Sequence, residues 1–402
     1  MLGVRARTGI GAFLIFLALA SEVRAQDEDV DPNPDPMPRL EGPNDPFGLG
    51  VKKLAYSVGM KIAEIYDDNV FLARDAEESD RITTLLLKTR LRYDLGEGAA
   101  LLNYRGRERL FAENTEFNGM EHFLDGSVTK TVSNLKFEAG LEWTALKDPF
   151  DVLQVTARVD SRYERARVLT AADFNRFDIE VSGAIARFSI DDDLLDRGDY
   201  LRREAAVLGA AQTWPQAAVF AEVRIQSTDY DEPDFSDFNF LSVDVGIRGT
   251  FTAKLRGEAR IGFGRVDTEG GGIFPVDDFT GLVAAASAVW EIGEKQELRA
   301  DLSRRPMESV LTGLAIADGV RIGYRHGITE RWTVQGMASW DREEESDGSN
   351  TRRGVALRGG VQWGFWDRYH ADLGLLYRVR KSDDRALEYE NFRVSLGIGV
   401  EW

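Results

Sequence analysis

From residue 54 onward, apolar and polar side chains alternate along the chain with a period of two. Leu85, Leu87 and Leu91 fall on one face of the segment 81–95, whereas Lys88 and Arg90 fall on the other. Because successive side chains of a β-strand point to opposite faces, this alternation predicts strands with one apolar and one polar face. The same pattern recurs in the segments 135–144, 241–248 and 392–402.

The alternating segments are long, and the connections between them differ in length in a regular way. The segments span about 10 to 14 residues, whereas strands of soluble proteins usually have about five or six. A strand tilted by about 45° needs roughly 9 to 11 residues to cross the apolar band of an outer membrane. Tight turns are expected at 96–98, 132–134, 214–216, 329–331 and 366–368. Longer loops are expected at about 66–80, 112–119, 229–237, 267–278, 306–318, 341–351 and 380–390.

Short turns that alternate with longer loops are typical of transmembrane barrels. We therefore predict an all-β fold, a transmembrane antiparallel up-and-down β-barrel of about 18 strands, with 16 strands as the alternative count. The stretch 164–198 is the least regular part of the pattern. Strand starts are expected near 54, 81, 99, 120, 135, 151, 166, 199, 217, 238, 255, 279, 296, 319, 332, 352, 369 and 391.

The first 53 residues differ in composition from the rest of the chain. Arg5 and Arg7 precede an apolar run and then Ala25, a pattern that predicts a signal peptide over residues 1–25, removed after Ala25. Residues 26–53 are rich in acidic side chains and proline, which predicts a disordered periplasmic leader. We expect residues 54–402 to form the barrel, located in the outer membrane of a Gram-negative cell.

Charge and residue usage exclude several functions. The formal net charge of -18 argues against nucleic acid as a partner, because phosphate binding needs a basic surface. The chain has no cysteine, and therefore no disulfides or cysteine ligands. His122, His326 and His370 have no serine or aspartate neighbours in a catalytic arrangement. We expect neither enzymatic activity nor a cofactor.

One short element resembles a known family. Tyr66, Asp67, Asp68 and Asn69, within the segment 64–71, resemble the opening of the putative β-barrel porin 2 family. The resemblance continues through 79–84, 302–309, 323–333 and the final strand, and covers roughly residues 54–402. Members of this family include outer-membrane components of exopolysaccharide loci. The resemblance therefore implies a barrel fold, an outer-membrane location and a role connected with exopolysaccharide.

If the apolar face contacts lipid, the polar face lines the barrel interior. Three basic residues of the segment 81–95 then lie beside three on its hairpin partner and form a basic ladder, which would attract anionic solutes or an acidic polysaccharide. The alternative is mutual neutralisation by Glu108, Glu138, Glu142, Glu258 and Asp301, in a lumen that carries no particular cargo. The candidate pore-lining residues are Lys88, Arg90, Arg92, Arg105, Arg107, Arg109, Arg256, Arg260, Arg321, Arg325 and Arg358.

Three functions stay open from the sequence. The first is a porin-like channel for anionic solutes or exopolysaccharide. The second is a structural or adhesive outer-membrane protein whose lumen is plugged, and the third is a soluble periplasmic all-β protein. The expected partners are outer-membrane lipid and lipopolysaccharide, the barrel-assembly machinery acting on the last strand up to Trp402, and exopolysaccharide or its export components.

Overall fold

A computed structural model describes residues 53–75, 77–148, 159–191, 199–232, 235–269, 278–309 and 313–402. The predicted signal peptide and all but the last residue of the predicted leader lie outside the described residues. None of the helices within these ranges is long and apolar enough to cross a membrane. They include two single-turn 3₁₀ helices, η3 (Thr115–Phe117) and η5 (Arg385–Leu387).

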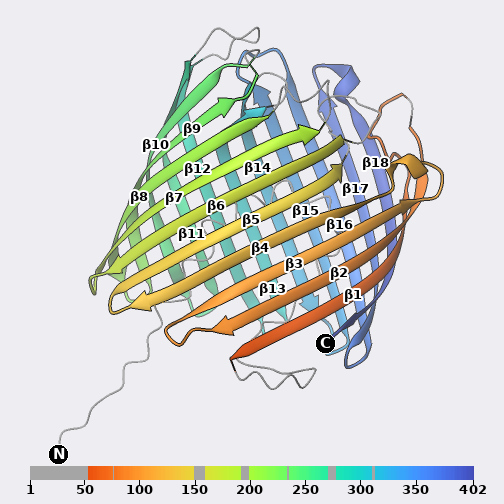
Figure 1. The fold of residues 1–402 in the computed structure, drawn as a ribbon, viewed down its shortest axis with the longest axis horizontal. Coiled ribbons are helices and arrows are strands. Elements are labelled where there is room, and N and C mark those ends of the chain that lie inside the picture. Colours follow the sequence, from red (N-terminus) through yellow and green to blue (C-terminus); the bar gives the residue numbers. More distant parts are fainter. Residues whose placement is uncertain are drawn as a thin grey trace, which may run out of the picture.

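The described residues form one closed sheet of 18 antiparallel strands. Each strand pairs with its neighbours in sequence, and β1 also pairs with β18. The strands wind around the barrel at a steep tilt, and the short turns, the start of β1 and the C-terminus lie at the same end (Figure 1). The strands are β1 (Leu54–Asp67), β2 (Asp80–Asp94), β3 (Gly98–Phe111), β4 (Gly119–Val132), β5 (Leu135–Asp148), β6 (Val159–Asp173), β7 (Phe177–Asp191), β8 (Tyr200–Trp214), β9 (Ala217–Tyr230), β10 (Asp237–Thr252), β11 (Leu255–Glu269), β12 (Phe279–Gly293), β13 (Gln296–Ser309), β14 (Gly313–Gly327), β15 (Trp332–Glu345), β16 (Thr351–Trp366), β17 (Tyr369–Ser382) and β18 (Tyr389–Glu401).

The predicted barrel and the count of 18 strands are confirmed, but some predicted boundaries are wrong. No strand starts near 166, because β6 runs unbroken to Asp173 and β7 begins at Phe177. The start expected near 151 lies outside the described residues. On β6 the exposed positions near the loop end hold Arg162 and Glu164, so the apolar alternation that marks a strand is missing there.

The sequence pattern also predicts loops at 306–318 and 341–351, and both predictions are wrong for most of these residues. Strands β13 to β16 instead extend far into both, with Glu308 opposite Leu314 and Glu344 opposite Thr351. Strands of this barrel therefore continue beyond the apolar positions into charged sequence. Hydrophobic periodicity alone marks only the part of each strand that faces the membrane interior.

Apolar side chains cover the outside of the barrel. Leu141 is 68 % exposed, Phe263 69 % and Leu396 61 %, whereas Lys88 and Asp372 are buried. Lys61 on β1 contacts Asp372 on β17 at 3.0 Å, across the intervening strand β18, so these polar side chains meet on the concave, inner face. The polar face therefore points into the barrel, and the apolar face points outward, as a membrane barrel requires.

Candidate pore lining and constriction

The basic ladder lies on the inner face of β2 and β3. Lys88 is directly opposite Arg105 in the register of these two strands, and Arg107 and Arg109 follow along β3. Like charges directly opposite one another destabilise a sheet. The guanidinium of Arg105 lies over the ring of Phe123, 4.0 Å from its centroid.

Carboxylates partly neutralise this ladder. Glu121 on β4 forms an ion pair with Arg107 and a second with Arg109 at 2.6 Å. Arg90 donates to Asn103 at 3.0 Å, and the Asn103 amide in turn donates to Asp125 at 3.1 Å. The Glu401 side chain, from β18, reaches the same wall beside Gly59, the residue opposite Lys88. Arg92 completes the ladder, opposite Ala55 and Leu101. Six basic side chains therefore face three carboxylates, Glu121, Asp125 and Glu401, in this sector.

The other five candidates do not join the ladder and are spread over β11, β14 and β16. Arg256 pairs with Glu291 and lies 4.0 Å from Glu297, and Arg260 lies 3.5 Å from Glu222. Arg321 is opposite Asp301 and Arg325 is opposite Glu297, whereas Arg358 is opposite Met337 and Leu376. Four of the five thus have an acidic neighbour in contact or in register. The sequence pattern could not separate these residues from the ladder, because it does not show which carboxylate lies opposite.

The acidic residues expected to neutralise the interior differ in their positions. Glu138 contacts Lys136 at 3.4 Å and Arg167 at 3.8 Å on the inner face, as the sequence interpretation required. Glu108 lies on the outer face instead, because it is in register with the exposed Leu85 and Met120. Glu108 therefore neutralises none of the ladder residues from within the barrel.

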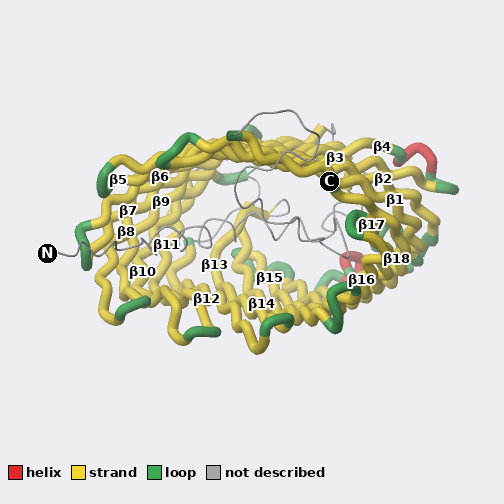
Figure 2. Tube along the Cα trace, turned by 90° about the horizontal axis from the view of Figure 1, so that it is seen from below, coloured by secondary structure: helices red, strands yellow, loops and turns green. Residues whose placement is uncertain are grey.

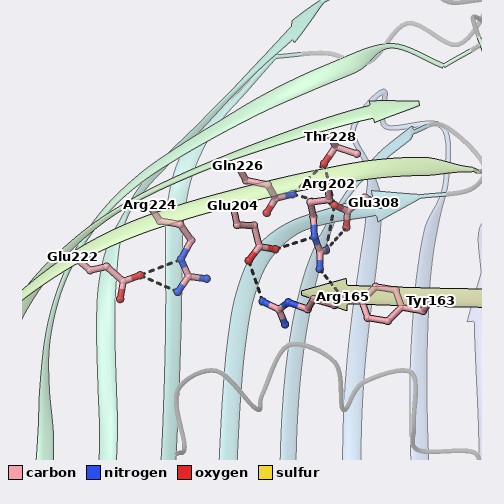
Figure 3. Close-up of polar contacts among 9 residues, drawn as sticks. All are labelled: Tyr163, Arg165, Arg202, Glu204, Glu222, Arg224, Gln226, Thr228 and Glu308. Atoms are coloured by element: carbon pink, nitrogen blue, oxygen red, sulfur yellow. Dashed lines mark hydrogen bonds and ion pairs between the residues drawn. The ribbon is translucent and has the colours of Figure 1, made fainter. Parts of the chain in front are cut away.

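A second feature is the loop end of the β13–β14 hairpin, which contacts the opposite part of the wall. The Glu308 carboxylate accepts hydrogen bonds from Gln226 at 3.0 Å and Thr228 at 3.2 Å on β9, and from Arg202 at 3.2 Å on β8 (Figure 3). Strands β10, β11 and β12 separate β9 from β13 along the wall. These contacts therefore cross the interior of the barrel. Figure 2 shows part of this wall pushed inward near β13.

Further polar contacts hold this end of the hairpin. Arg202 also bonds to Glu204 at 2.8 Å and to the Tyr163 hydroxyl at 3.3 Å, and Glu204 bonds to Arg165 at 3.1 Å. Each charge in this chain of contacts has an opposite charge beside it, which is what burial of ionic groups demands.

Apolar packing holds the same hairpin from its other strand. Leu314 is fully buried and packs in a cluster with Phe238, Phe240, Val266 and Val283, which come from β10, β11 and β12. A second cluster around Tyr163, Phe188 and Tyr200 fills the inner wall next to it. The interior beside β6 to β13 is thus filled by packed side chains near the loop end.

The two features lie far apart in the cross-section. Seen along the barrel, β8 and β10 lie at one end of an oval, and β1 and β2 at the other (Figure 2). We name the loop end of the β13–β14 hairpin, residues 305–309 and 314–316, the constriction hairpin. In the sequence, the only sign of this hairpin is the change from the basic Arg304 and Arg305 to the acidic Glu308 across Pro306, which by itself is equally compatible with a polar loop.

The three histidines lie on separate strands, β4, β14 and β17. His122 bonds to the Tyr104 hydroxyl at 3.0 Å, and His326 lies 3.4 Å from the amide of Gln296. His370 lies beside Gly399 in the last strand pair. Within the ranges that the structure describes, no three acidic or histidine side chains are grouped to hold a metal ion.

A single closed sheet with an apolar exterior and a charged interior defines an outer-membrane β-barrel of the porin type. The family model described as Putative beta-barrel porin 2 matches residues 55–402. The chain therefore belongs to this family, and the resemblance found in the sequence is confirmed.

Other comparisons add solved structures of low sequence identity. No curated protein matches the chain. OccK2 (OpdF) of Pseudomonas aeruginosa is 9 % identical, with a TM-score of 0.46 over 87 % of this chain and 98 % of that one. A BenF-like porin of Pseudomonas fluorescens Pf-5 is 8 % identical, with a TM-score of 0.47 over 86 % and 99 %. OccAB3 of Acinetobacter baumannii is 9 % identical, with a TM-score of 0.45 over 88 % and 100 %.

Proposed function

We propose that this protein is an outer-membrane channel that prefers anions, and that the basic ladder on β2 and β3 sets this preference. The observation that carries the proposal is the placement of Lys88 directly opposite Arg105 on the inner face. In this sector six basic side chains stand beside three carboxylates. A wall that held charges only for packing would pair opposite signs, as the wall around Arg202 does.

The physical basis is the field of the ladder. Clefts and channels with low-dielectric walls focus field lines, so a local excess of positive charge raises the concentration of anions beside it. The constriction hairpin occupies the opposite part of the interior, near β8 and β9. A solute that passes the hairpin is therefore kept toward the side of the barrel on which the ladder lies.

The test is ion selectivity in a planar bilayer. The full chain is refolded, and the reversal potential is measured in a KCl gradient for the wild type and for the Lys88→Gln/Arg105→Gln variant. The wild type should prefer chloride, and the variant should lose most of that preference. The matched control is Arg256→Gln/Arg299→Gln, which removes the same number of positive charges beside Glu291 and Glu297. It should keep the preference.

Three results would contradict the proposal. A preference for potassium in the wild type would mean that the carboxylates dominate, and an unchanged preference in the ladder variant would mean that the ladder has no role. A barrel that is folded but conducts no ions would favour the second function, a structural or adhesive protein with a plugged lumen.

Passage of an acidic exopolysaccharide is the narrower form of this proposal. Its support is the sign of the ladder charge together with the family resemblance. Oligomers of a uronic acid, added on one side of the bilayer, should block the current at lower concentration than neutral dextrans of the same length. The Lys88→Gln/Arg105→Gln variant should lose the difference, and equal block of the wild type by both polymers would contradict the narrower form.

Delivery to the outer membrane is a proposal of the same kind. We expect cleavage after Ala25, which N-terminal sequencing of the mature protein tests. The last strand, β18, alternates apolar and polar residues up to Trp402 and closes the sheet against β1. This strand is the segment that we expect the barrel-assembly machinery to bind.

A further inference from the structure

An outward-facing row of charged side chains crosses five neighbouring strands. The register places Arg304 on β13 opposite Asp318 on β14, and Asp318 opposite Arg342 on β15. Arg342 is in turn opposite Arg353 on β16, and Arg353 is opposite Lys381 on β17. We call these five residues the basic row. Three basic side chains in succession thus stand directly opposite one another, an arrangement that destabilises a sheet by itself.

The basic row lies at the upper edge of the apolar surface, on the side of the longer loops. On each of the five strands, the next outward-facing residue toward the short turns is apolar. These five residues are also opposite one another in the register. Leu302, Trp340 and Val355 in this layer are 47 %, 39 % and 39 % exposed, so the row shares their outward face. The complete layer is Leu302, Val320, Trp340, Val355 and Val379. The row therefore lies where the acyl chains of a membrane end and its headgroups begin.

Carboxylates neutralise only one end of the row. Asp318 binds Arg304 at 2.7 Å and lies 3.8 Å from Arg342, which also bonds to Glu344 at 2.7 Å. Arg353 and Lys381 are exposed, and neither makes an ion pair with any other residue in the described part of the chain. The row itself therefore has four cations and two partnering carboxylates. Two further exposed carboxylates lie at this edge, Glu390 opposite Val379 and Asp383 two residues beyond Lys381, and neither makes an ion pair with the row in the described part of the chain.

We propose that the basic row binds the phosphate groups of a phosphorylated glycolipid in the outer leaflet, with Arg353 and Lys381 as the main ligands. Arginine and lysine are the side chains that bind phosphate oxygens best, by charge-assisted hydrogen bonds. Neighbouring strands are about 4.8 Å apart, so Arg342, Arg353 and Lys381 span about 10 Å along the membrane surface. A headgroup with two phosphates on linked sugars can meet all three, while its acyl chains lie against Trp340 and Val355.

The location favours a lipid over a dissolved anion. A phosphate held by the row is attached to acyl chains that cover the apolar layer directly below, so binding removes apolar surface from water as well as neutralising charge. A dissolved anion would neutralise the charge but would bury no apolar surface. The inference needs the apolar face to contact lipid, but it does not need the barrel to conduct ions.

The test measures lipid binding by native mass spectrometry of the full-length protein in a neutral detergent. The probe is lipid A with two phosphates, titrated into the micelles. We expect about a fivefold loss of affinity for each basic residue removed, so that Arg353→Gln/Lys381→Gln binds about 25-fold more weakly than wild type. Lipid A stripped of both phosphates should bind the wild type no better than it binds this variant.

The matched control is Arg187→Gln/Arg203→Gln. Both arginines are exposed on the outer face, at 60 % and 54 %, and each pairs with a carboxylate, Asp231 or Asp229. This variant should keep the affinity of the wild type within about twofold, because each removed charge was already neutralised. The heat-dependent shift of the folded band on a gel shows whether each variant forms the barrel. If the double variant does not fold, the single variant Arg353→Gln is measured in its place.

Three results would overturn the inference. Equal binding of lipid A by wild type and Arg353→Gln/Lys381→Gln would show that the row is not the site. Equal binding of the dephosphorylated lipid would assign the affinity to acyl chains alone. Displacement of lipid A by inorganic phosphate at the same concentration would show a site for free anions. Each of these results is independent of the ion selectivity measured for the ladder.

Discussion

Replacing Asn69 by alanine should destabilise the seam at which the barrel closes. Asn69 follows β1 and has no exposed surface. Its amide donates to the Glu390 carbonyl at 2.9 Å, on β18, and to the Ala73 carbonyl at 2.6 Å, and its oxygen accepts from the Ala73 amide at 2.9 Å. Asn391, also fully buried, donates to Asp67 at 2.5 Å and to the Asn69 carbonyl at 3.2 Å. The family element that contains Asn69 thus ties β1 to β18.

The size of the destabilisation follows from the three hydrogen bonds that the Asn69 side chain makes. Alanine at position 69 leaves one amide and two carbonyl groups without their partner. A buried polar group that loses its only partner costs about 1–3 kcal/mol. Ala73 and Glu390 are partly or fully exposed, so water can replace some of the lost bonds. We therefore expect a loss of about 2–4 kcal/mol in the free energy of unfolding.

The assay is reversible unfolding by urea in lipid vesicles, with the folded fraction read from the band that shifts on heating. Asn239→Ala is the control, because Asn239 makes one exposed hydrogen bond to Glu269, at 3.0 Å. It should change stability by less than about 0.5 kcal/mol. A cycle with Asn391→Ala should show non-additive losses, since the two asparagines share one network. The reasoning fails if Asn69→Ala is as stable as Asn239→Ala.

Two further substitutions test the interior and the exterior of the barrel. Glu308→Gln removes the charge that Arg202 binds, so the constriction hairpin should detach more readily and the channel should admit larger polyethylene glycols. The outer-face variant Glu344→Gln is the control. If both variants have the same size limit as the wild type, the hairpin has no role in constriction. Leu141→Arg places a charge at an exposed position in the middle of β5 and should cost about 2–4 kcal/mol in vesicles; wild-type stability would contradict the assignment of this face to lipid.

The sequence predicts the barrel well because its main signal is local. Alternation within one strand requires no knowledge of the neighbours, and the tight turns, such as Gly96 to Gly98, show where strands end. The signal fails at β6, where Arg162 and Glu164 occupy outward positions above the apolar surface. It also fails at 306–318, where strands run through charged sequence.

The interior and the surface sites depend on information that no single strand contains. Alternation predicts that Glu308 faces outward like Leu302, yet its carboxylate binds Arg202 inside the barrel, because the hairpin bends after leaving the wall. The basic row needs the register of five strands at once, and a shift of one residue at any pair moves a side chain to the other face. Strand register is set by turns and packing that the apolar pattern leaves open.

Basic side chains stand directly opposite one another at two places among the strand pairs that the structure describes. One is Lys88 with Arg105 inside the barrel, and the other is Arg342 with Arg353 and Lys381 outside. Elsewhere basic residues in register face acids or uncharged side chains, as Arg248 faces Glu258 and Arg352 faces Glu343.

Like charges that stand directly opposite one another lower the stability of a sheet. At both places the basic side chains outnumber the carboxylates that face them in the register. Both also face a medium other than the protein core, the interior in one case and the headgroup layer in the other. An anion from that medium would be bound favourably, because it relieves the repulsion between the basic side chains. The same electrostatic argument therefore supports both proposals, a solute path along the ladder and a lipid phosphate on the basic row. The net charge of -18 excludes a general excess of basic residues as the cause, so the two clusters are local features of the fold.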